Sequence, residues 1–482
     1  MGMRRREARQ ESLWFARSEI VTPPGHRFYQ QLDTLLSANS FDRKVEDLSA
    51  PYYEPEGTPG RPSIPPSRYF RMLLIGYFEG LESERGICWR CADSFSLREF
   101  LGLDLTNRIA DHSTLSRIRS RLPDHVYSAI FELVLEMVDR AGLLKGKVAG
   151  IDSTYLRADA SMKTIVRRDT GEGYADFLIG LAKESGIEHP SAEDGRRVDR
   201  SRKGKKTSNK DWVSPSDPDA RIARLKDGRT RLAYKAEHVV DMDTSAIVAA
   251  EIHPANEADT ATLLSTLDLA EDNIEAVNSS SIEDANDGPD APNPGADSSK
   301  DGFTEIVGDK GYHKAELLRD LRDRDYRTYI PEPRIHGKRH WHNKGGIDTA
   351  RAVYLNRART LRPKSRKLQR RRGELLERPF AHICETGAHR RTRLRGRPNV
   401  AKRYVIQAAA WNLGLILRHR IGVGSPRAFA DSPRKVARAL RPLGYRICAT
   451  FCRLNSALQH ATPSRNSLSR IYVTKGFVAI GR

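Results

Sequence analysis

The stretch VAGIDST, residues 148–154, contains a short apolar run that leads to a carboxylate, Asp152. A run of this length is typical of a buried β-strand. A second apolar run, residues 305–308, leads in the same way to Asp309. Acids that follow strands are fixed by a rigid sheet, so Asp152 and Asp309 are the first candidates for a functional site.

A third acid comes from the segment RRRGELLERPF, residues 370–380, which is predicted to be a basic helix that carries Glu377. Glu374, three residues earlier, is the alternative acid on this helix. Carboxylate oxygens are the ligands that hard cations prefer. Two such cations, roughly 3.5–4 Å apart, can activate a nucleophile and stabilise the leaving oxygen of a phosphodiester. The three acids therefore predict a site for two Mg²⁺ ions, for which Mn²⁺ can substitute.

The composition indicates a polyanionic partner. The 482 residues include 82 Lys and Arg against 62 Asp and Glu, a formal net charge of +20. Such a charge favours nucleic acid, DNA or RNA, over a small-molecule substrate. No run of about 18 apolar residues occurs, and no apolar segment follows the N-terminal MGMRRR, so neither a membrane span nor a signal peptide is expected. The cytoplasm is the expected location.

The five cysteines do not have the pattern of a disulfide framework. Cys88 and Cys91 have the spacing of half a zinc site, and Cys448 and Cys452 lie one helical turn apart, so a four-thiolate zinc site is one interpretation. The first pair lies in an apolar, aromatic segment, where buried structural thiols are the plainer interpretation.

The N-terminal part of the chain is predicted to be helical. Residues 1–25 form a polar basic arm, and residues 26–145 form an all-helical DNA-binding domain that a proline-rich segment interrupts at 51–66. Within this domain the segment DHSTLSRIRSRL, residues 111–122, is expected to be a capped helix with arginines on one side. We interpret it as a DNA recognition helix, and the alternative is a solvated basic face. Its candidate contacts are Arg117, Arg119 and Arg121.

From residue 147 the pattern changes to short strands. Three strands, a helix, a strand, a helix and a strand follow one another, an order typical of an α/β domain with a mixed sheet. This domain spans residues 146–420, and two polar stretches in it, residues 164–211 and 278–300, are interpreted as mobile insertions. The basic tail, residues 421–482, receives no function. The expected strands are 148–155, 232–240, 246–252, 306–307 and 328–330, and the expected helices are 257–269 and 314–321.

The segment from Arg351 to Arg403 is very basic, with 18 Lys or Arg against three acids. A single-sign segment of this density is expected to bind a polyanion or to stay exposed. Arg372 and Arg378 lie on either side of Glu377 and are predicted to hold the scissile strand of DNA. The alternative is that they pair with acids of the core and orient the helix.

Three motifs resemble the catalytic blocks of bacterial insertion-sequence transposases of the DDE type. The order and spacing of the motifs match as well, and the resemblance covers most of residues 26–420. The catalytic motifs are IDSTY at 151–155, VGDKGY at 307–312 and R-x4-ERPF at 372–380. Residues 234–241 and 247–259 are similar to further strands and a helix start of that family, and the Arg61-Pro62 region and DHST at 111–114 are similar to its DNA-binding part.

The resemblance implies an RNase H-like mixed sheet flanked by helices and preceded by an all-helical N-terminal domain. It implies that Asp152, Asp309 and Glu377 bind two Mg²⁺ ions, cut double-stranded DNA at the terminal inverted repeats of the element and join the ends to target DNA. Lys310 and Tyr312, beside the second acid, would then contact DNA. A homo-oligomer in the synaptic complex, a location at the bacterial nucleoid and no membrane partner also follow from the resemblance.

The chain departs from one pattern within this family. One group has a Tyr-Arg-Glu-Lys pattern around the catalytic Glu. Here Cys384 stands at the position of that Lys, seven residues after Glu377, and Gly373 stands at the position of the Arg. The neighbouring Arg372 can take the place of that Arg.

Two other classes of protein are consistent with the sequence. An RNase H-like nuclease or resolvase would share the acids without needing the basic C-terminal half or the N-terminal helices. A DNA-binding protein without catalysis would keep the charge and lose nothing if Asp152 were Asn. Metal-dependent cleavage of a terminal inverted repeat separates the three classes.

Overall fold

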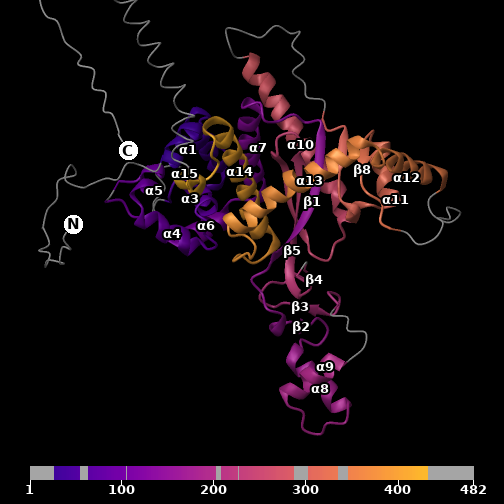
Figure 1. Cartoon of the computed structure of the whole chain (residues 1–482). Helices are drawn as coiled ribbons and strands as arrows, with labels where there is room; N and C mark the ends of the chain where they lie inside the picture. The colour runs from indigo at the N-terminus through magenta and orange to yellow at the C-terminus, as the bar shows by residue number, and fades with distance from the viewer. Residues whose placement is uncertain are drawn as a thin grey trace, which may run out of the picture. The chain divides into compact units, whose positions relative to one another are not determined.

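The computed structural model describes residues 27–54, 63–104, 106–201, 208–225, 227–286, 302–334 and 346–431 (Figure 1). The expected N-terminal arm, residues 1–25, and all but the start of the expected C-terminal tail lie outside these ranges. Within them, no helix combines the length and the apolar character that a membrane span needs.

A mixed sheet is the centre of the fold, and its middle strand is β1 (Val148–Arg157). On one side β1 pairs with antiparallel β5, whose other edge carries antiparallel β6 and β4. On the other side β1 pairs with parallel β7, which pairs with parallel β8. The predicted RNase H-like mixed sheet is thereby confirmed. The bounds of these strands are β4 Arg221–Arg224, β5 Thr230–Asp241, β6 Ile247–Pro254, β7 Glu305–Val307 and β8 Arg327–Tyr329.

The alternation of side chains along β1 distributes two helices between the faces of the sheet. Asp152 accepts a hydrogen bond from Arg372 of α13 (Pro363–Ala381). The next residue, Ser153, donates to the first residue of α10 (Asp259–Asn286) instead. α13 therefore lies against one face of β1 and α10 against the other. α11 (Ala315–Asp323) and α12 (Gly346–Thr360) pack beside β8 (Figure 1).

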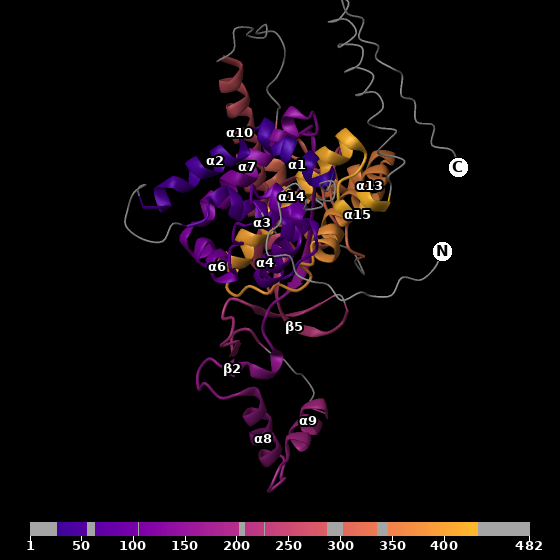
Figure 2. The same ribbon diagram turned by 90° about the vertical axis from the view of Figure 1, so that its left-hand side faces the viewer.

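The predicted N-terminal helices are confirmed, and they pack around α3 (Pro66–Phe78) (Figure 2). This helix is apolar on all sides, which predicts burial, and it is buried from Tyr69 to Phe78. Its buried Arg71 is neutralised by hydrogen bonds to Asp33 and Asp42. The other helices are α1 Arg27–Ala38, α2 Phe41–Ser49, α4 Glu84–Asp93, α5 Phe95–Phe100, α6 His112–Arg121 and α7 Asp124–Arg140.

α14 (Arg397–Ile421) joins these helices to the sheet. It contacts α3, α7 and β6, and it is buried over most of its length. Its Asn412 forms two hydrogen bonds with the backbone of Ile247, at 2.9 and 2.8 Å, and Trp411 donates to the carbonyl of Ser245. A helix from the C-terminal part of the chain thus completes the packing of the N-terminal helices.

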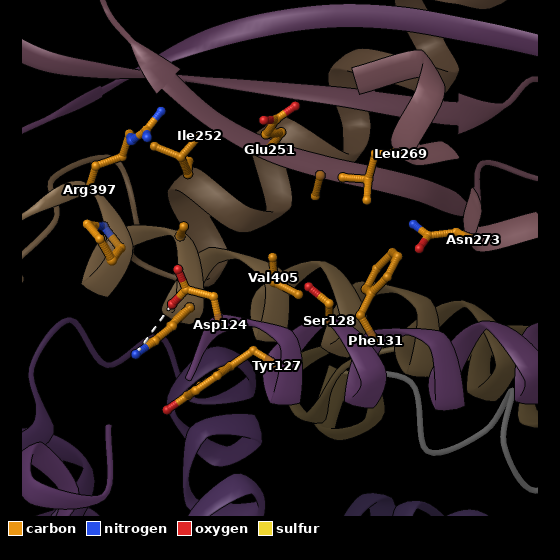
Figure 3. A pocket seen from close by; sticks show the side chains of 14 residues that line it. Asp124, Tyr127, Ser128, Phe131, Glu251, Ile252, Leu269, Asn273, Arg397 and Val405 are labelled. Carbon is orange, nitrogen blue, oxygen red and sulfur yellow. Dashed lines mark ion pairs between the residues drawn. The ribbon is translucent and has the colours of Figure 1, made fainter. Parts of the chain in front are cut away.

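A cavity of about 280 Å³ remains at this junction, between α7, β6, α10 and α14 (Figure 3). Phe131, Ile252 and Val405 are among its apolar walls. Lys402 and Asp124 form an ion pair there at 3.4 Å, from α14 and α7 respectively. The cavity lies on the β6 side of the sheet, so β5 separates it from Asp152 on β1.

The expected insertion at residues 164–211 is folded over most of its length, contrary to the prediction of mobility. Tyr174 and Phe177 pack edge to face on Trp212, with ring centroids 5.2 and 5.3 Å away. Trp212 lies just outside the polar stretch, so the composition of that stretch concealed this small aromatic core. α10 likewise extends into the second expected insertion. The first insertion, residues 164–211, contains β2 Val166–Arg167, α8 Tyr174–Glu184 and α9 Ala192–Ser201, and β3 Trp212–Val213 follows it directly.

Replacement of Gly414 by alanine is expected to destabilise the fold. A Cβ atom at Gly414 of α14 would lie 2.7 Å from the carbonyl oxygen of Gly424, closer than packed atoms allow. We expect Gly414→Ala to lower the free energy of unfolding by about 1–3 kcal/mol in urea denaturation. Gly180→Ala in α8 is the matched control, because a Cβ there meets no atom within 4 Å and alanine is the better helix former. Equal effects of the two substitutions would contradict the close packing of α14.

Candidate active site

Asp152 and Asp309 come from neighbouring parts of the sheet. The last register pair between β1 and β7 is Gly150 with Val307. Asp152 lies two residues further along β1, and Asp309 lies two residues after Val307, in the turn that follows β7. Adjacent strands lie about 4.8 Å apart, so the backbones at these two predicted acids leave the paired part of β1 and β7 at the same end.

The turn that follows β7, η4 (Lys310–Tyr312), fixes the side chain of Asp309. The Oδ1 atom of Asp309 accepts a hydrogen bond from the backbone N–H of Gly311 at 2.6 Å. Lys310 is exposed beside the acid. Tyr312 is fully buried and donates its hydroxyl hydrogen bond to Glu237 at 2.8 Å. The hypothesis that Tyr312 contacts DNA does not fit this burial, and its hydroxyl instead ties the turn to β5.

A further acid, Asp259, lies at the same place and was not predicted to belong to the site. Its Oδ1 accepts hydrogen bonds from Ser153 at 2.9 Å and from Lys235 at 3.3 Å. A Cβ atom on Gly311 would lie 3.0 Å from Asp259 Oδ2 and 2.8 Å from Asp309 Oδ1, so the two carboxylates meet at this glycine. Acids are common in the first turn of any helix, so the sequence position of Asp259 did not distinguish it.

A buried polar network lies beneath these acids. Glu237 is fully buried, and its oxygens accept hydrogen bonds from Thr262 at 3.0 Å and Thr266 at 2.7 Å as well as from the tyrosine hydroxyl. Burial alone raises the pKa of Glu237, but His253, the hydroxyl groups and the charge of Lys235 outweigh it and hold the pKa below its ordinary value. The stability that this carboxylate contributes is therefore present at neutral pH and is lost as the pH falls through its lowered pKa.

Arg372 on α13 pairs with Asp152. Its Nη1 donates to Asp152 Oδ2 at 2.8 Å, and the two side chains are 18% and 16% exposed. Arg372 Nε is buried and has no hydrogen-bond partner within the described part of the chain. Arg378, in contrast, is exposed and pairs with Glu374 at 3.4 Å. The sequence left two interpretations open for these arginines, and the geometry of Arg372 is that of an arginine that orients its helix against an acid of the core.

Glu374 and Glu377 lie one turn apart on α13. Phe380 stacks on His238, the strand partner of Asp152, with ring centroids 4.1 Å apart. Glu377 is three residues from Phe380 and three residues from Glu374, so it lies between them around the helix. Glu374 pairs with Arg378, four residues later. Both carboxylates are exposed, and Glu377 is the nearer of the two to the flank of Phe380.

Two arginines lie in line with Glu377 on the same flank of α13. Arg366, Arg370, Gly373 and Glu377 recur at spacings of four, three and four, which aligns them on one side of the helix. We call this set the Glu377 row. Arg366 and Arg370 are exposed and have no carboxylate within ion-pair distance among the described residues. The glycine leaves the row open between the arginines and the acid.

The chemistry of the donors fits a hard divalent cation. Asp152 lies on β1, Asp309 lies in the turn after the adjacent β7, Asp259 lies near Asp309 at Gly311, and Glu377 is exposed on α13. All of these donors are carboxylate oxygens, the ligands that Mg²⁺ and Mn²⁺ take. Over the ranges that the structure describes, no three or more such side chains stand close enough to hold an ion without rearrangement.

Two of the three arginines predicted on α6 are exposed. These are Arg117 and Arg121. Arg119 is largely buried, pairs with Glu84 and donates to Asn399 of α14 at 3.2 Å. Arg119 thus fastens α6 to its neighbours, and its place in the packing does not support the predicted contact with DNA.

Of the three cysteines that the structure describes, Cys91 and Cys384 are buried and Cys88 is partly buried. Cys384 lies in the π-helical turn His382–Thr386 and is 2% exposed, and burial raises its pKa to about 11. The side chain at this position therefore does not reach a phosphate. Burial also raises the pKa of Cys88 and of Cys91 to about 12. Cys448 and Cys452, the other half of the zinc interpretation, lie outside the described residues.

Two family models match the chain. Residues 16–121 match a family described as Transposase domain (DUF772), and residues 210–413 match one described as Transposase DDE domain. Asp309 and Glu377 fall within the second match. Asp152 falls between the two matches, on the strand that lies in the middle of the sheet of the second. No curated protein and no solved structure matches the chain significantly.

These matches agree with the resemblance of the motifs and with the mixed sheet. The chain belongs to the insertion-sequence transposases of the DDE type.

Removal of Arg372 is expected to destabilise the protein. Arg372→Ala leaves the largely buried carboxylate of Asp152 without its cation, which should lower the free energy of unfolding by about 1–3 kcal/mol. Arg378→Ala is the control on the same helix, because its exposed pair with Glu374 contributes at most about 0.5 kcal/mol. Urea denaturation measures both. An Arg372→Ala protein of unchanged stability, with a flatter salt dependence of DNA binding, would show instead that this arginine contacts phosphate.

Proposed function

We propose that the protein binds the terminal inverted repeats of its own insertion sequence, cuts the DNA there by metal-dependent phosphodiester hydrolysis and joins the ends to target DNA. The observation that carries this proposal is that Asp152 on β1 and Asp309 in the turn after the adjacent β7 follow the last register pair of these two parallel strands, in a chain of net charge +20. Paired acids of this kind suit two-metal phosphodiester chemistry.

The acids have separate roles in this proposal. Asp152, Asp309 and Glu377 would hold two Mg²⁺ ions, and Mn²⁺ can replace them. When bound, the ions polarise the scissile phosphate and lower the pKa of the attacking water. Asp259 is a positioning residue, because its carboxylate accepts hydrogen bonds from Ser153 of β1 and Lys235 of β5 and lies beside the turn that carries Asp309. Arg372 donates a hydrogen bond to the first acid and orients it before the ions bind.

The nucleophile changes between the two steps. In cutting, the oxygen of water attacks phosphorus in line, the bond from phosphorus to the 3′ oxygen breaks, and that oxygen takes a proton to become a hydroxyl. In joining, this 3′ hydroxyl attacks a target phosphate, loses its proton and displaces a second 3′ oxygen. One site therefore serves both steps, since each exchanges one oxygen on phosphorus for another.

The DNA contacts proposed here are exposed cations. On α6 the proposed contacts are Arg117 and Arg121. Lys310 is the proposed contact beside the active site. On α13 the proposed contacts are Arg366 and Arg370 of the Glu377 row. Because two element ends must be brought together, the active form is proposed to be a homo-oligomer in the synaptic complex, at the bacterial nucleoid.

An RNase H-like nuclease is the second candidate, because the sheet and the acids serve hydrolysis equally well. A nuclease gives cut DNA and no joined product. Strand transfer of labelled end DNA into a target plasmid therefore separates the two functions.

Neutral isosteres of the three acids are expected to abolish cutting. Asp152→Asn, Asp309→Asn and Glu377→Gln each remove a negative charge while keeping the shape, so cleavage of a plasmid that carries the flanking DNA of the gene should fall to the level seen with EDTA. Binding of the same DNA should change little. Glu374→Gln is the matched control on α13 and should cut normally. A dead Glu374→Gln enzyme beside an active Glu377→Gln enzyme would exchange the two assignments.

Loss of Arg370 is expected to weaken the electrostatic part of DNA binding. Each phosphate contact that is removed should reduce the slope of log affinity against log salt by about 0.9 on duplex DNA. Arg370→Gln should show this change with an unaltered melting temperature, since the side chain is exposed and unpaired among the described residues. Arg378→Gln is the control, because its charge is already paired. The same slope for both variants and the wild type would remove the Glu377 row from the DNA surface.

A further inference from the structure

A pocket of about 260 Å³ lies at the far end of β1, beyond the acids. Three arginines and one acid line it, together with Thr154, Tyr155 and Leu225; the charged residues are Arg157, Arg231, Arg390 and Asp227. Its volume is below that of pockets that enclose a whole small-molecule ligand, about 300–1,000 Å³. The pocket therefore suits a small charged group of a larger molecule.

Three segments of the chain bring these arginines together. Arg157 of β1 pairs with Ala233 of β5, so Arg231, two residues before, points to the same face of the sheet. The backbone N–H of Arg157 donates to the carbonyl of Arg390 at 3.0 Å, and the N–H of Thr392 donates to the carbonyl of Arg157 at 2.9 Å. The segment after α13 thus runs along β1 and adds its cations to the same place.

The positive charge at this pocket is not balanced. Arg157 has no carboxylate within ion-pair distance in the ranges that the structure covers. Arg231 reaches Asp227 at 3.7 Å, near the limit of an ion pair. Arg391 and Arg395 share one acid, Asp159.

Two further arginines at the pocket have one acid each. Arg390 pairs with Glu385, and Arg393 pairs with Glu82. The six arginines in and around the pocket therefore keep an excess of positive charge after all of these ion pairs are made. We call them the arginine cluster: Arg157, Arg231, Arg390, Arg391, Arg393 and Arg395.

Repulsion within the cluster affects Arg157 most directly. Burial lowers the pKa of this guanidinium, and the neighbouring charges of Arg231, Arg391 and Arg393 lower it further. Arg391 Nε is also buried without a hydrogen-bond partner among the described residues. An anion in the pocket would relieve the repulsion and accept the free donors, and the planar fork of arginine matches a phosphate group.

We propose that this pocket binds a backbone phosphate of the duplex DNA that occupies the active site. Arg157 follows Ser153 by four residues on β1 and so points to the same face of the sheet, the face on which Ser153 donates to Asp259 beside the turn of Asp309. Four residues at about 3.3 Å each are roughly 13 Å, or about four base-pair steps of B-form DNA. The pocket, which we call the distal phosphate site, fixes the direction of the duplex along β1. This inference rests on the proposed function, because it takes DNA as the substrate.

Salt titrations of DNA binding by the full-length protein test the distal phosphate site. A short fluorescent duplex of fixed sequence is the probe, with wild type, Arg157→Gln, Arg231→Gln and the control Arg319→Gln. Glutamine keeps most of the arginine stem and removes its charge. Arg319 lies on α11, where Asp320 already pairs with it at 2.8 Å. Each pocket variant should reduce the slope of log affinity against log salt by about 0.9, and the control should leave it unchanged.

Three readouts separate the ways in which the inference can fail. Slopes equal to wild type for both pocket variants overturn it. Inorganic phosphate alone is the second readout. If it stabilises wild type but not Arg157→Gln while the slopes stay unchanged, the pocket binds a free anion and the inference is overturned. If Arg157→Gln lowers the melting temperature, the slope of Arg231→Gln decides.

Plasmid cleavage by the same wild-type preparation distinguishes this failure from failure of the proposed function. Reduced slopes without Mg²⁺-dependent cleavage would support the distal phosphate site and contradict the proposed chemistry. Cleavage with unchanged slopes would do the reverse.

Discussion

The alternation of side chains along β1 is the constraint on which the rest of the molecule depends. Because Asp152 and Ser153 point to opposite faces, one strand fastens α13 through Arg372 and α10 through Asp259. A slip of one residue in this strand would exchange the faces and separate every one of these partners. The hydrogen bonds of Asp152 and Ser153 to the two helices oppose such a slip, since they are made in one register only.

Most of the fold could be predicted from the sequence because the signals were local. The apolar runs before Asp152 and Asp309 specified the two strands, and the spacing of strands and helices specified the mixed sheet. The cap and periodicity of residues 111–122 specified α6. These features depend on the order of residues within one segment, and no distant partner is needed to recognise them.

The parts of the site that were missed depend on contacts between segments. Tyr312 follows an acid in a basic chain and therefore suggested a DNA contact, although its ring is buried against β5. Arg119 has the same spacing as exposed arginines, and only the approach of α4 and α14 buries it. Asp259 was placed at the start of a helix and not in the site, because its nearness to Asp309 is created by the turn at Gly311. Charge and spacing within one segment carry no information about such neighbours.

The position of α14 has a consequence for the making of the protein. The N-terminal helices leave the ribosome first, yet the helix that packs between α3, α7 and β6 is synthesised about 260 residues after α7 ends. Domains commonly fold as they emerge, but here the apolar sides of the early helices stay uncovered until residues 397–421 follow. The N-terminal helices and the mixed sheet consequently mature together. A chain that ends before residue 397 would lack the helix that packs between them.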